Sequence, residues 1–447
     1  MRSVYLALIY LSFLLLGTVA PFVFSLGYVW VDAATPQHIA YFLLNQIPCA
    51  LIMGICAIGG YLLLDRRAPP KNFAFSILTI IFALWCTLST AFWAVSPETA
   101  WGKWDWAIKT LLFCAFIPFV FRSRVQIEAF FQVLMFSLGV QIIPFGAKVV
   151  LSGGGYGRDL GAIGGNSGLS EGSTLAAAAT MTIPILMFLR THGQLLPKSR
   201  LTGWFFYAMI FASIATAVGT YERTALVGLV VVGISIWLQT NRKILYGVLG
   251  CAVAACIVYG TSSGWNQRIS TINEYSKDSS ALGRLLVWKW TLDFVKENPQ
   301  GGGFDAYRID RIVFPDPSPD DPNDGVVTGR AFHSIYFEIL GEQGWFGLGV
   351  FAAIVLISLR ALRRVVRRAK QIADLTWCGE LARALTSSLL ALLACGAFVG
   401  IGYQPVLWYL FAASACVYAH ARQVEQATLT VSRRVSLPPR LAHIPVP

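Results

Sequence analysis

Long apolar stretches separated by short polar gaps run through almost the whole chain. A window of roughly 19 residues, the length that identifies a membrane-spanning helix, finds about twelve such stretches. Several are shorter than an ideal span of about 20 residues, so the pattern defines the number of helices better than their ends. The predicted spans are 4–24, 39–64, 73–93, 106–121, 125–151, 174–189, 201–219, 224–238, 244–260, 334–359, 385–401 and 406–419.

This pattern predicts an all-α, polytopic membrane protein with one large loop. The only long polar interval is 262–332, about 70 residues, and loops of that length usually carry function. The chain then divides into nine spans over 1–261, the loop over 262–332, three spans over 333–421 and a tail over 422–447.

Composition supports the membrane assignment. Hydrophobic residues make up 56% of the chain and charged residues 13%, which excludes a soluble enzyme. The 14 tryptophans are typical of the aromatic belts at two membrane surfaces. Trp101, Trp104 and Trp106 fit such a belt, although they could also stack on sugar.

The basic residues behind the formal charge of +12 lie mainly in the gaps between the predicted spans. Basic residues gather in the gaps after the second, fourth, sixth, eighth and tenth spans, which lie on one side if the chain alternates. They are Arg66, Arg67, Lys71, Arg122, Arg124, Arg190, Lys198, Arg200, Arg242, Lys243 and the cluster 360–370. Because positive loops stay in the cytoplasm, both termini are predicted to be cytoplasmic and the large loop external. The charge therefore indicates topology and contact with anionic membrane lipids rather than a nucleic-acid partner.

The first span has a second interpretation. Residues 2–20 end in small side chains before Pro21 and could form a signal peptide. More apolar spans follow at once, which favours an uncleaved first helix.

No disulfide framework or metal site is indicated. The nine cysteines lie in apolar spans or on the predicted cytoplasmic side, and none lies in the large loop. The loop does contain an acidic cluster, but its spacing fits no ligand loop and favours a solvated surface over a cation site. Its members are Asp316, Asp320, Asp321 and Asp324.

The loop begins with a predicted helix over 281–298, which Pro299 and three glycines end. Its polar stripe consists of Lys289, Asp293, Lys296 and Glu297, and its apolar face of Leu285, Trp288, Leu292 and Val295. Arg284 lies on the apolar side. It is either an arginine that snorkels at a helix start or an anion contact at the membrane interface.

His333 stands where the large loop returns to the membrane. If the following helix is continuous from His333, four residues share the histidine's face, namely Phe337, Gly341, Gly344 and Gly347, with Glu338 and Glu342 opposite. Glycines on that face would let a second helix or a bulky substrate approach closely. A histidine here is a helix cap, an interfacial residue or a general base, since neutral imidazole is the usual base near pH 7.

Arg223 lies at the predicted external end between the seventh and eighth spans. A structural interpretation is an ion pair with its neighbour Glu222, although adjacent helix positions do not face each other. The predicted topology puts Arg223, Arg284 and His333 on one side of the membrane. Two guanidinium groups and a base at a lipid interface suit a lipid-diphosphate substrate, because guanidinium forks bind phosphate oxygens without Mg²⁺.

The segment 333–347, HSIYFEILGEQGWFG, resembles the motif of bacterial O-antigen ligases. In that family a His followed by Asn, Ser or Gln is separated by nine residues from Gly-x-x-Gly, which here are His333, Ser334, Gly344 and Gly347. The resemblance extends to O-antigen polymerases and protein O-oligosaccharyltransferases. It also covers the layout of the spans, the arginines at 223 and 284, and an N-terminal half like that of exosortase-associated ligases. Many members carry Asn-Pro-Asn near the sixth span, but this chain does not, so Asn166 and Glu171 receive no role.

The resemblance implies a GT-C-like glycosyltransferase in the bacterial inner membrane, with its active site on the periplasmic face. It implies an inverting, metal-independent transfer, without a cofactor, from undecaprenyl diphosphate to a sugar hydroxyl of the lipid A core. Arg223 and Arg284 would hold the diphosphate, and His333 would take the acceptor proton or orient the hydroxyl.

Two other functions stay open. A polymerase or a protein O-oligosaccharyltransferase would differ only in its acceptor. A transporter is a third hypothesis, but the sequence shows no internal repeat and no pair of broken helices at matching positions, which that class often has.

Overall fold

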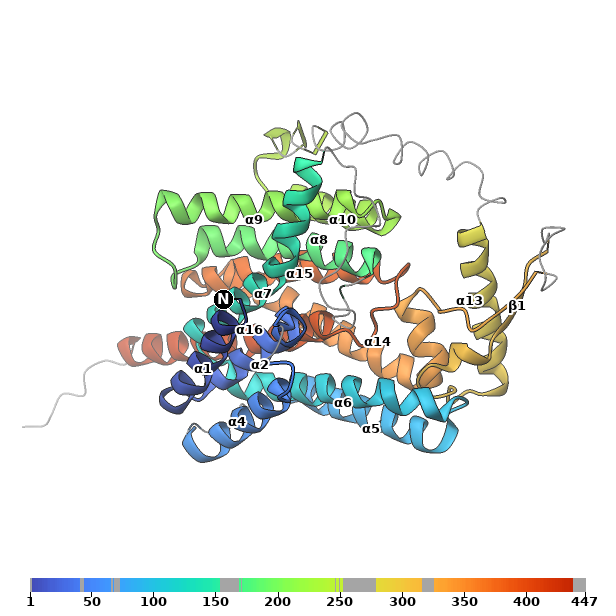
Figure 1. Ribbon diagram of the computed structural model, residues 1–447. Coiled ribbons are helices and arrows are strands. Elements are labelled where there is room, and N and C mark those ends of the chain that lie inside the picture. Colours follow the sequence, from blue (N-terminus) through green and yellow to red (C-terminus); the bar gives the residue numbers. More distant parts are fainter. Residues whose placement is uncertain are drawn as a thin grey trace, which may run out of the picture.

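The computed structural model describes residues 2–40, 44–65, 67, 73–152, 169, 171–245, 247–248, 250–251, 279–315 and 325–436. Within these ranges the fold is a helical bundle with one small antiparallel ribbon (Figure 1). Seven of the described helical segments are long and apolar enough to cross a membrane, and three shorter helices are also apolar. The protein is therefore an all-α, multi-pass membrane protein.

The elements follow one another along the chain as α1 (Arg2–Val19), α2 (Phe22–Ala34), α3 (Pro36–Ile39), α4 (Cys49–Leu64), α5 (Ala74–Trp93), α6 (Pro97–Val120), α7 (Arg124–Leu151) and α8 (Gly172–His192). The second half contains α9 (Arg200–Gly219), α10 (Arg223–Gln239), α13 (Ser279–Glu297), η2 (Ala306–Ile309), β1 (Arg311–Val313), β2 (Val326–Thr328), α14 (Ile335–Ala369), η3 (Ala373–Leu375), α15 (Thr376–Cys395) and α16 (Pro405–Ser436).

Helices α5, α7, α9 and α10 coincide with predicted spans to within one or two residues at each end. The first two predicted spans were wrong, because prolines divide them. Pro21 lies between α1 and α2, and α4 starts only at Cys49, directly after Pro48. Most of the predicted span 244–260 and the acidic cluster lie outside the described residues.

Three predicted spans near the C-terminus are also longer or shifted. Helix α14 continues to Ala369, ten residues beyond the predicted end, and α15 begins at Thr376. Helix α16 extends to Ser436 and so passes the predicted start of the tail at 422. These extensions are polar and basic, so a hydropathy window does not detect them.

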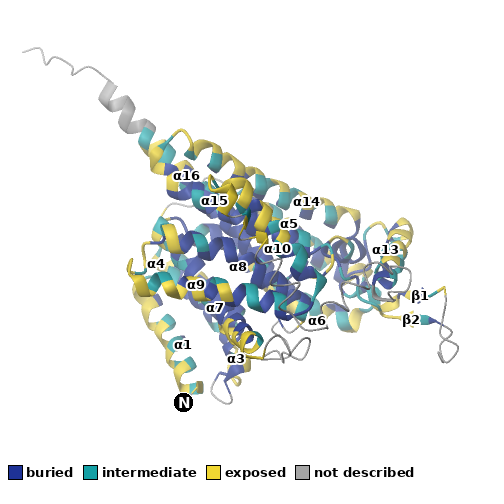
Figure 2. Cartoon of the chain, turned by 90° about the horizontal axis from the view of Figure 1, so that it is seen from above, coloured by how far each residue is buried: buried dark blue, intermediate teal, exposed yellow. Residues whose placement is uncertain are grey.

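Helix α8 is the core of the bundle. Of its most apolar 18-residue window 89% is buried, against 11% for α1, which lies at the periphery (Figure 2). The small residues Ala176–Ala179 let α9, α10 and α15 pack closely around it.

Basic turns that are distant in sequence meet at one end of the bundle. Arg67 donates to the side chain of Gln126 at the start of α7 (3.0 Å), and Arg124 donates to the carbonyl of His192 at the end of α8 (3.4 Å). The opposite end carries α13 and β1 (Figure 1). The bundle therefore has a basic end and a loop end, and the positive-inside rule predicts that the basic end faces the cytoplasm.

Helix α14 is not continuous, which corrects the helical wheel drawn from His333. Gly344 has φ 63° and ψ −166°, a conformation outside the helical region. The wheel therefore cannot place Gly344 and the residues after it. A break leaves backbone groups without their helical partners, and in a membrane protein these groups need other partners.

The segment that follows α13 supplies those partners. Gly302 and Gly303 donate backbone N–H groups to the carbonyls of Gly341 (3.0 Å) and Glu342 (2.9 Å). Beyond the break, the N–H of Trp345 donates to the carbonyl of Pro299 (3.0 Å). A Cβ atom on Gly344 would lie 2.2 Å from that carbonyl oxygen, so only glycine allows the approach. Gly344 thus receives the protein's own loop, whereas Gly341 lies against Thr291 of α13 and Gly347 against Trp85 of α5.

We expect Gly344→Ala to destabilise the protein by at least about 1–3 kcal/mol, because the side chain would be strained at positive φ and would clash with Pro299. Thermal unfolding of the detergent-solubilised protein measures the effect. Gly349→Ala, in the same helix with nothing near its added Cβ, should leave the unfolding temperature unchanged or raise it. Equal stability of the two variants would contradict a structural role for the break.

Candidate functional site

A cavity of about 380 Å³ lies at the loop end of the bundle. It is formed by α6, the start of α14, the segment before α8, the loop around η2 and the turn before α16. Its lining includes Lys103, Trp106, Glu171, Asp305, Tyr307, Phe332, His333, Glu338, Tyr403 and Gln404. His333 is the only one of the three residues predicted for catalysis or diphosphate binding that lines this cavity.

The backbone holds His333 in an unusual conformation. Its φ of 47° is left-handed, which is uncommon for a side chain of this size and persists only where neighbours fix it. On one side, the Trp288 indole N–H donates to the carbonyl of Phe332 (2.9 Å). On the other, the N–H of Ile335 donates to the carbonyl of Gly396 (2.7 Å). These two anchors fix the backbone on either side of His333.

Trp288 also links His333 to Arg284. The indole stacks on Phe337 with ring centroids 4.9 Å apart and planes 2° from parallel. Arg284 lies one helical turn before Trp288, so the contact that anchors the histidine's backbone also positions the arginine.

The helical wheel of α13 was right for its polar stripe and partly wrong for its apolar face. Lys289, Asp293, Lys296 and Glu297 are all exposed, as predicted. Leu285 and Leu292, however, are 47% and 40% exposed, and the buried side is formed by Val287, Thr291 and Val295. The apolar face is rotated because the helix packs on α14 and β1 rather than lying on lipid.

His333 is surrounded by charges that act on its protonation. Burial lowers the pKa of the imidazole, and the guanidinium groups of Arg284 and Arg330 lower it further. The carboxylates of Glu222 and Glu338 act in the opposite direction without reversing the shift. The ring is therefore neutral near pH 7, the form that a general base requires.

Arg330 is a cationic residue at this site that the sequence analysis missed. A Cβ atom added to Gly283 would lie 2.2 Å from its Cζ, so the guanidinium lies directly over the residue before Arg284. It also stands 5.4 Å from the Phe314 ring, and its backbone N–H donates to Asp310 (3.0 Å). The only sequence signal was its position three residues before His333.

Arg223 begins α10 at the same end of the bundle but does not line the cavity. The Cys395 thiol donates to the carbonyl of Thr224 (3.4 Å), next to Arg223, and Gly396 is the residue that anchors Ile335. The preceding residue, Glu222, influences the pKa of His333. The structure thus brings the neighbourhoods of Arg223, Arg284 and His333 together, and the assignment of both arginines to a diphosphate stays a prediction.

A buried ion network forms the inner wall of the cavity. Lys103 Nζ lies 2.8 Å from Glu338 Oε1 and 2.7 Å from Glu342 Oε1, and 3.9 Å from Asp305 Oδ1. Backbone N–H groups also donate to these carboxylates. The N–H of Gly402 donates to Glu338 (2.9 Å), and the N–H of Asp305 donates to Glu342 (3.0 Å). The network joins α6, α14, the η2 loop and the turn before α16.

The wheel from His333 had placed Glu338 opposite the histidine, which was wrong. His333 precedes α14 and has a left-handed backbone, so helical spacing does not relate the two residues. Both in fact line the same cavity. The spacing of Glu338 and Glu342 did indicate one face, but the partner, Lys103, is 235 residues away in the chain.

The other motif residues shape the backbone. Ser334 is 1% exposed and occupies the N-cap position of α14, where its carbonyl accepts from the N–H of Glu338 (2.8 Å). A Cβ atom on Gly347 would lie 2.2 Å from that of Gln343. Gln343 is itself held by Ser89, which donates to its side chain (2.6 Å). In the described part of the chain, no group of three or more His, Cys, Asp or Glu residues could hold a metal ion.

Comparison with known proteins agrees with the motif. Residues 207–352 match the family model described as O-Antigen ligase, which covers Arg223, Arg284, His333 and both motif glycines. Residues 1–194 match a family of unknown function, DUF5935. No curated protein matches the chain closely enough to add a relative. The resemblance to the O-antigen ligase superfamily is thus confirmed.

We expect Lys103→Met to destabilise the protein by about 3–5 kcal/mol, because it leaves two buried carboxylates without their cation. Adding Glu342→Gln should restore part of the loss. Lys109→Met, which breaks an exposed ion pair with Asp105 on the same helix, should cost less than about 1 kcal/mol. Denaturant unfolding of the purified protein measures all three, and similar losses for Lys103→Met and Lys109→Met would contradict the role of the buried network.

Proposed function

Residues 207–352 belong to the O-antigen ligase family, and from this premise we propose that the protein is an O-antigen ligase of lipopolysaccharide biosynthesis. It transfers a glycan from undecaprenyl diphosphate to a sugar hydroxyl of the lipid A core. The observation that carries the proposal is a neutral histidine held rigidly between a group of arginines and a polar, aromatic cavity.

The arginine side of His333 is the proposed donor site. Arg284 and Arg330 both act electrostatically on the imidazole, and Arg223 begins α10 at the same end of the bundle. Guanidinium groups bind phosphate oxygens in pairs and stabilise the charge that develops on a departing diphosphate. In this proposal the arginines neutralise the diphosphate without a metal ion.

The cavity is the proposed acceptor site. Trp106, Tyr307 and Tyr403 provide flat apolar surfaces for a sugar ring, while Glu171 and Asp305 offer carboxylates that accept hydrogen bonds from its hydroxyl groups. The lining thus combines aromatic rings with charged groups, which suits a ligand that has both flat faces and hydroxyl groups.

The proposed reaction is a single displacement. An acceptor hydroxyl enters from the cavity and gives its proton to the neutral imidazole of His333, while its oxygen bonds to the anomeric carbon. The bond from that carbon to the diphosphate oxygen breaks on the opposite side, so the configuration inverts. The arginines hold the undecaprenyl diphosphate that leaves.

The positive-inside rule gives the proposed orientation. With the basic end of the bundle in the cytoplasm of the bacterial inner membrane, the end of α16 is cytoplasmic and the cavity opens on the periplasmic face. Helix α1 does not fit the predicted cytoplasmic N-terminus. The Tyr10 hydroxyl donates to the carbonyl of Cys49 at the start of α4, and Pro21 lies against Gly60 near the basic end of α4, so α1 starts away from the basic end. The GT-C-like class and about twelve spans are part of the same proposal.

A transfer assay with the purified full chain tests the function. One undecaprenyl-diphosphate-linked glycan is offered separately with lipid A core, with a second lipid-linked glycan and with a pilin-like protein. We expect product only with lipid A core, and the same rate in EDTA because guanidinium groups neutralise the donor. Transfer to the second glycan would indicate a polymerase instead, and transfer to the protein an O-oligosaccharyltransferase.

The same assay tests the donor site. Arg284→Ala should reduce transfer by about 10²- to 10³-fold and weaken donor binding, and Arg284→Lys should lose much of the activity because it lacks the planar fork. Lys289→Ala, on the exposed face of the same helix, is the matched control and should behave as wild type. Unchanged transfer and donor affinity in Arg284→Ala would make Arg284 an interfacial anchor.

The lowered pKa of His333 predicts the pH dependence of transfer. A base must be neutral, so activity should rise with pH and reach its half-maximum below about 6.5, the ordinary value for histidine. Arg330→Gln removes a cation that lowers this pKa, so the midpoint should move to higher pH, whereas Arg311→Gln on the exposed strand β1 should leave it in place.

His333→Ala completes this test. It should retain donor binding and lose about 10²- to 10⁴-fold in transfer, the usual effect of losing a proton acceptor. Normal turnover in His333→Ala, or a pH midpoint that Arg330→Gln does not move, would show that the imidazole is not the base.

A further inference from the structure

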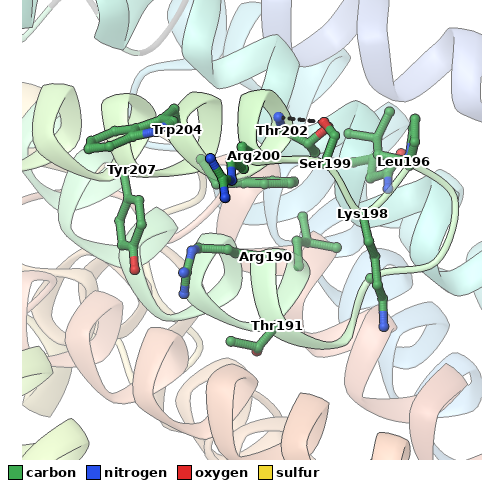
Figure 3. A pocket seen from close by; sticks show the side chains of 15 residues that line it. Arg190, Thr191, Leu196, Lys198, Ser199, Arg200, Thr202, Trp204 and Tyr207 are labelled. Atoms are coloured by element: carbon green, nitrogen blue, oxygen red, sulfur yellow. Dashed lines mark hydrogen bonds between the residues drawn. The ribbon is translucent and has the colours of Figure 1, made fainter.

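A second cavity, of about 650 Å³, lies at the basic end of the bundle. It is lined by the last turn of α8, the first two turns of α9 and the turn that connects these two helices. Figure 3 shows the side chains that surround it, among them Arg190, Lys198, Arg200 and Tyr207. The proposed function uses none of these residues.

Among the described residues, no carboxylate lies within ion-pair distance of the three basic residues at this cavity, Arg190, Lys198 and Arg200. Arg190 is held in place by Tyr207, with its Cζ 3.9 Å from the ring centroid. Three like charges around one cavity repel one another, so an anion that enters is favoured by all three.

The acidic residues near the end of α8 are already engaged elsewhere. Glu128 is 1% exposed and accepts hydrogen bonds from the backbone N–H groups of Gln194 and Leu195. Glu380 forms an ion pair with Arg383. Neither carboxylate lines the cavity, so its lining remains strongly positive.

The backbone adds to this positive field. Helix α9 is 20 residues long and starts at Arg200, so the positive end of its dipole lies at the cavity. Ser199 caps only one N–H of the first turn, that of Thr202. Helix starts with N–H groups still available favour phosphate.

An apolar surface adjoins the cavity. Trp204, which lines the cavity, is 71% exposed, and Leu201, which follows Arg200 in the sequence, is 81% exposed. Both belong to a helix apolar enough to cross a membrane. Exposed side chains of this kind on a membrane helix face acyl chains, and tryptophan concentrates at the headgroup level. The cations therefore stand beside a surface suited to the tail of a lipid.

The basic cavity, lined by Arg190, lies one membrane thickness away from His333. Glu171, at the start of α8, lines the catalytic cavity, while Arg190 and Thr191, at its end, line the basic one. The 21 residues of α8 span about 30 Å, which matches the hydrocarbon thickness of a bilayer. The two cavities are thus at opposite faces of the membrane.

We propose that the cavity formed by Arg190, Lys198 and Arg200 binds the phosphate of an anionic phospholipid headgroup. The guanidinium and ammonium groups and the start of α9 bind the phosphate oxygens, and Leu201 and Trp204 contact the lipid chains. This site is separate from the proposed donor and acceptor sites and does not depend on the proposed function.

Native mass spectrometry of the full chain in detergent tests the site with phosphatidylglycerol as the probe and phosphatidylcholine as the comparison. We expect wild-type protein to retain phosphatidylglycerol preferentially. Removing three charges with Arg190→Ala, Lys198→Ala and Arg200→Ala should weaken binding by roughly 10²-fold, from about fivefold for each charge. The control variant Arg360→Ala, Arg363→Ala and Lys370→Ala removes two exposed charges of α14 and one directly after it, none of which lines the cavity, and should bind as wild type.

A second variant avoids disturbing the fold. Lys198→Ala with Arg200→Ala keeps the contact between Arg190 and Tyr207 and should still lose at least about tenfold in affinity. Inorganic phosphate at millimolar concentration is the final arm: failure to displace phosphatidylglycerol supports a lipid, and complete displacement assigns the same cations to a soluble phosphate. Equal retention of both lipids, or equal weakening in the control, would overturn the proposal.

Discussion

The break of α14 at Gly344 is the constraint on which the rest of the site depends. Backbone groups inside a membrane protein must find partners within the protein, because lipid offers none and each unmet group costs several kcal/mol. Here the segment from Pro299 to Gly303 provides them, and Val95 in turn donates to the carbonyl of Gly302 (2.9 Å). One set of hydrogen bonds therefore fixes the end of α13 against both α14 and the turn after α5. Without the break, the segment after α13 would lose these hydrogen bonds to α14.

This attachment positions one of the cationic groups that act on His333. Fixing the end of α13 sets the height of Trp288, whose indole holds the carbonyl of Phe332 and whose helix carries Arg284. Two of the acidic groups, Glu338 and Glu342, lie on the other side, where Lys103 binds both. Glu171 lies close enough to Arg284 for the guanidinium to act on its carboxylate. A diphosphate and a sugar hydroxyl would then enter from different sides, with the imidazole between them.

The sequence predicted those features that depend on neighbouring residues. Uninterrupted apolar runs predicted α5 and α7, and helical spacing predicted the exposed stripe of α13. It failed where partners are distant: nothing near Lys103 indicates carboxylates 235 and 239 residues later. The motif identified Gly344 but not why a glycine is needed there, because the positive φ is required only once the loop packs against this residue. Arg330 was missed for the same cause, since its position over Gly283 depends on the fold of the whole loop.

Helix α8 connects the two ends of the molecule, and its burial makes that connection rigid. A buried helix of 21 residues is a rigid spacer of about 30 Å, so fixing one end relative to a membrane surface fixes the other. Its last turn carries Arg190 beside the basic cavity, and Glu171 at its start lines the cavity that contains His333. A phospholipid headgroup held at Arg190 would set the depth of α8 in the bilayer. The imidazole would then lie at the opposite headgroup level, the depth at which a membrane-anchored diphosphate presents its reacting carbon.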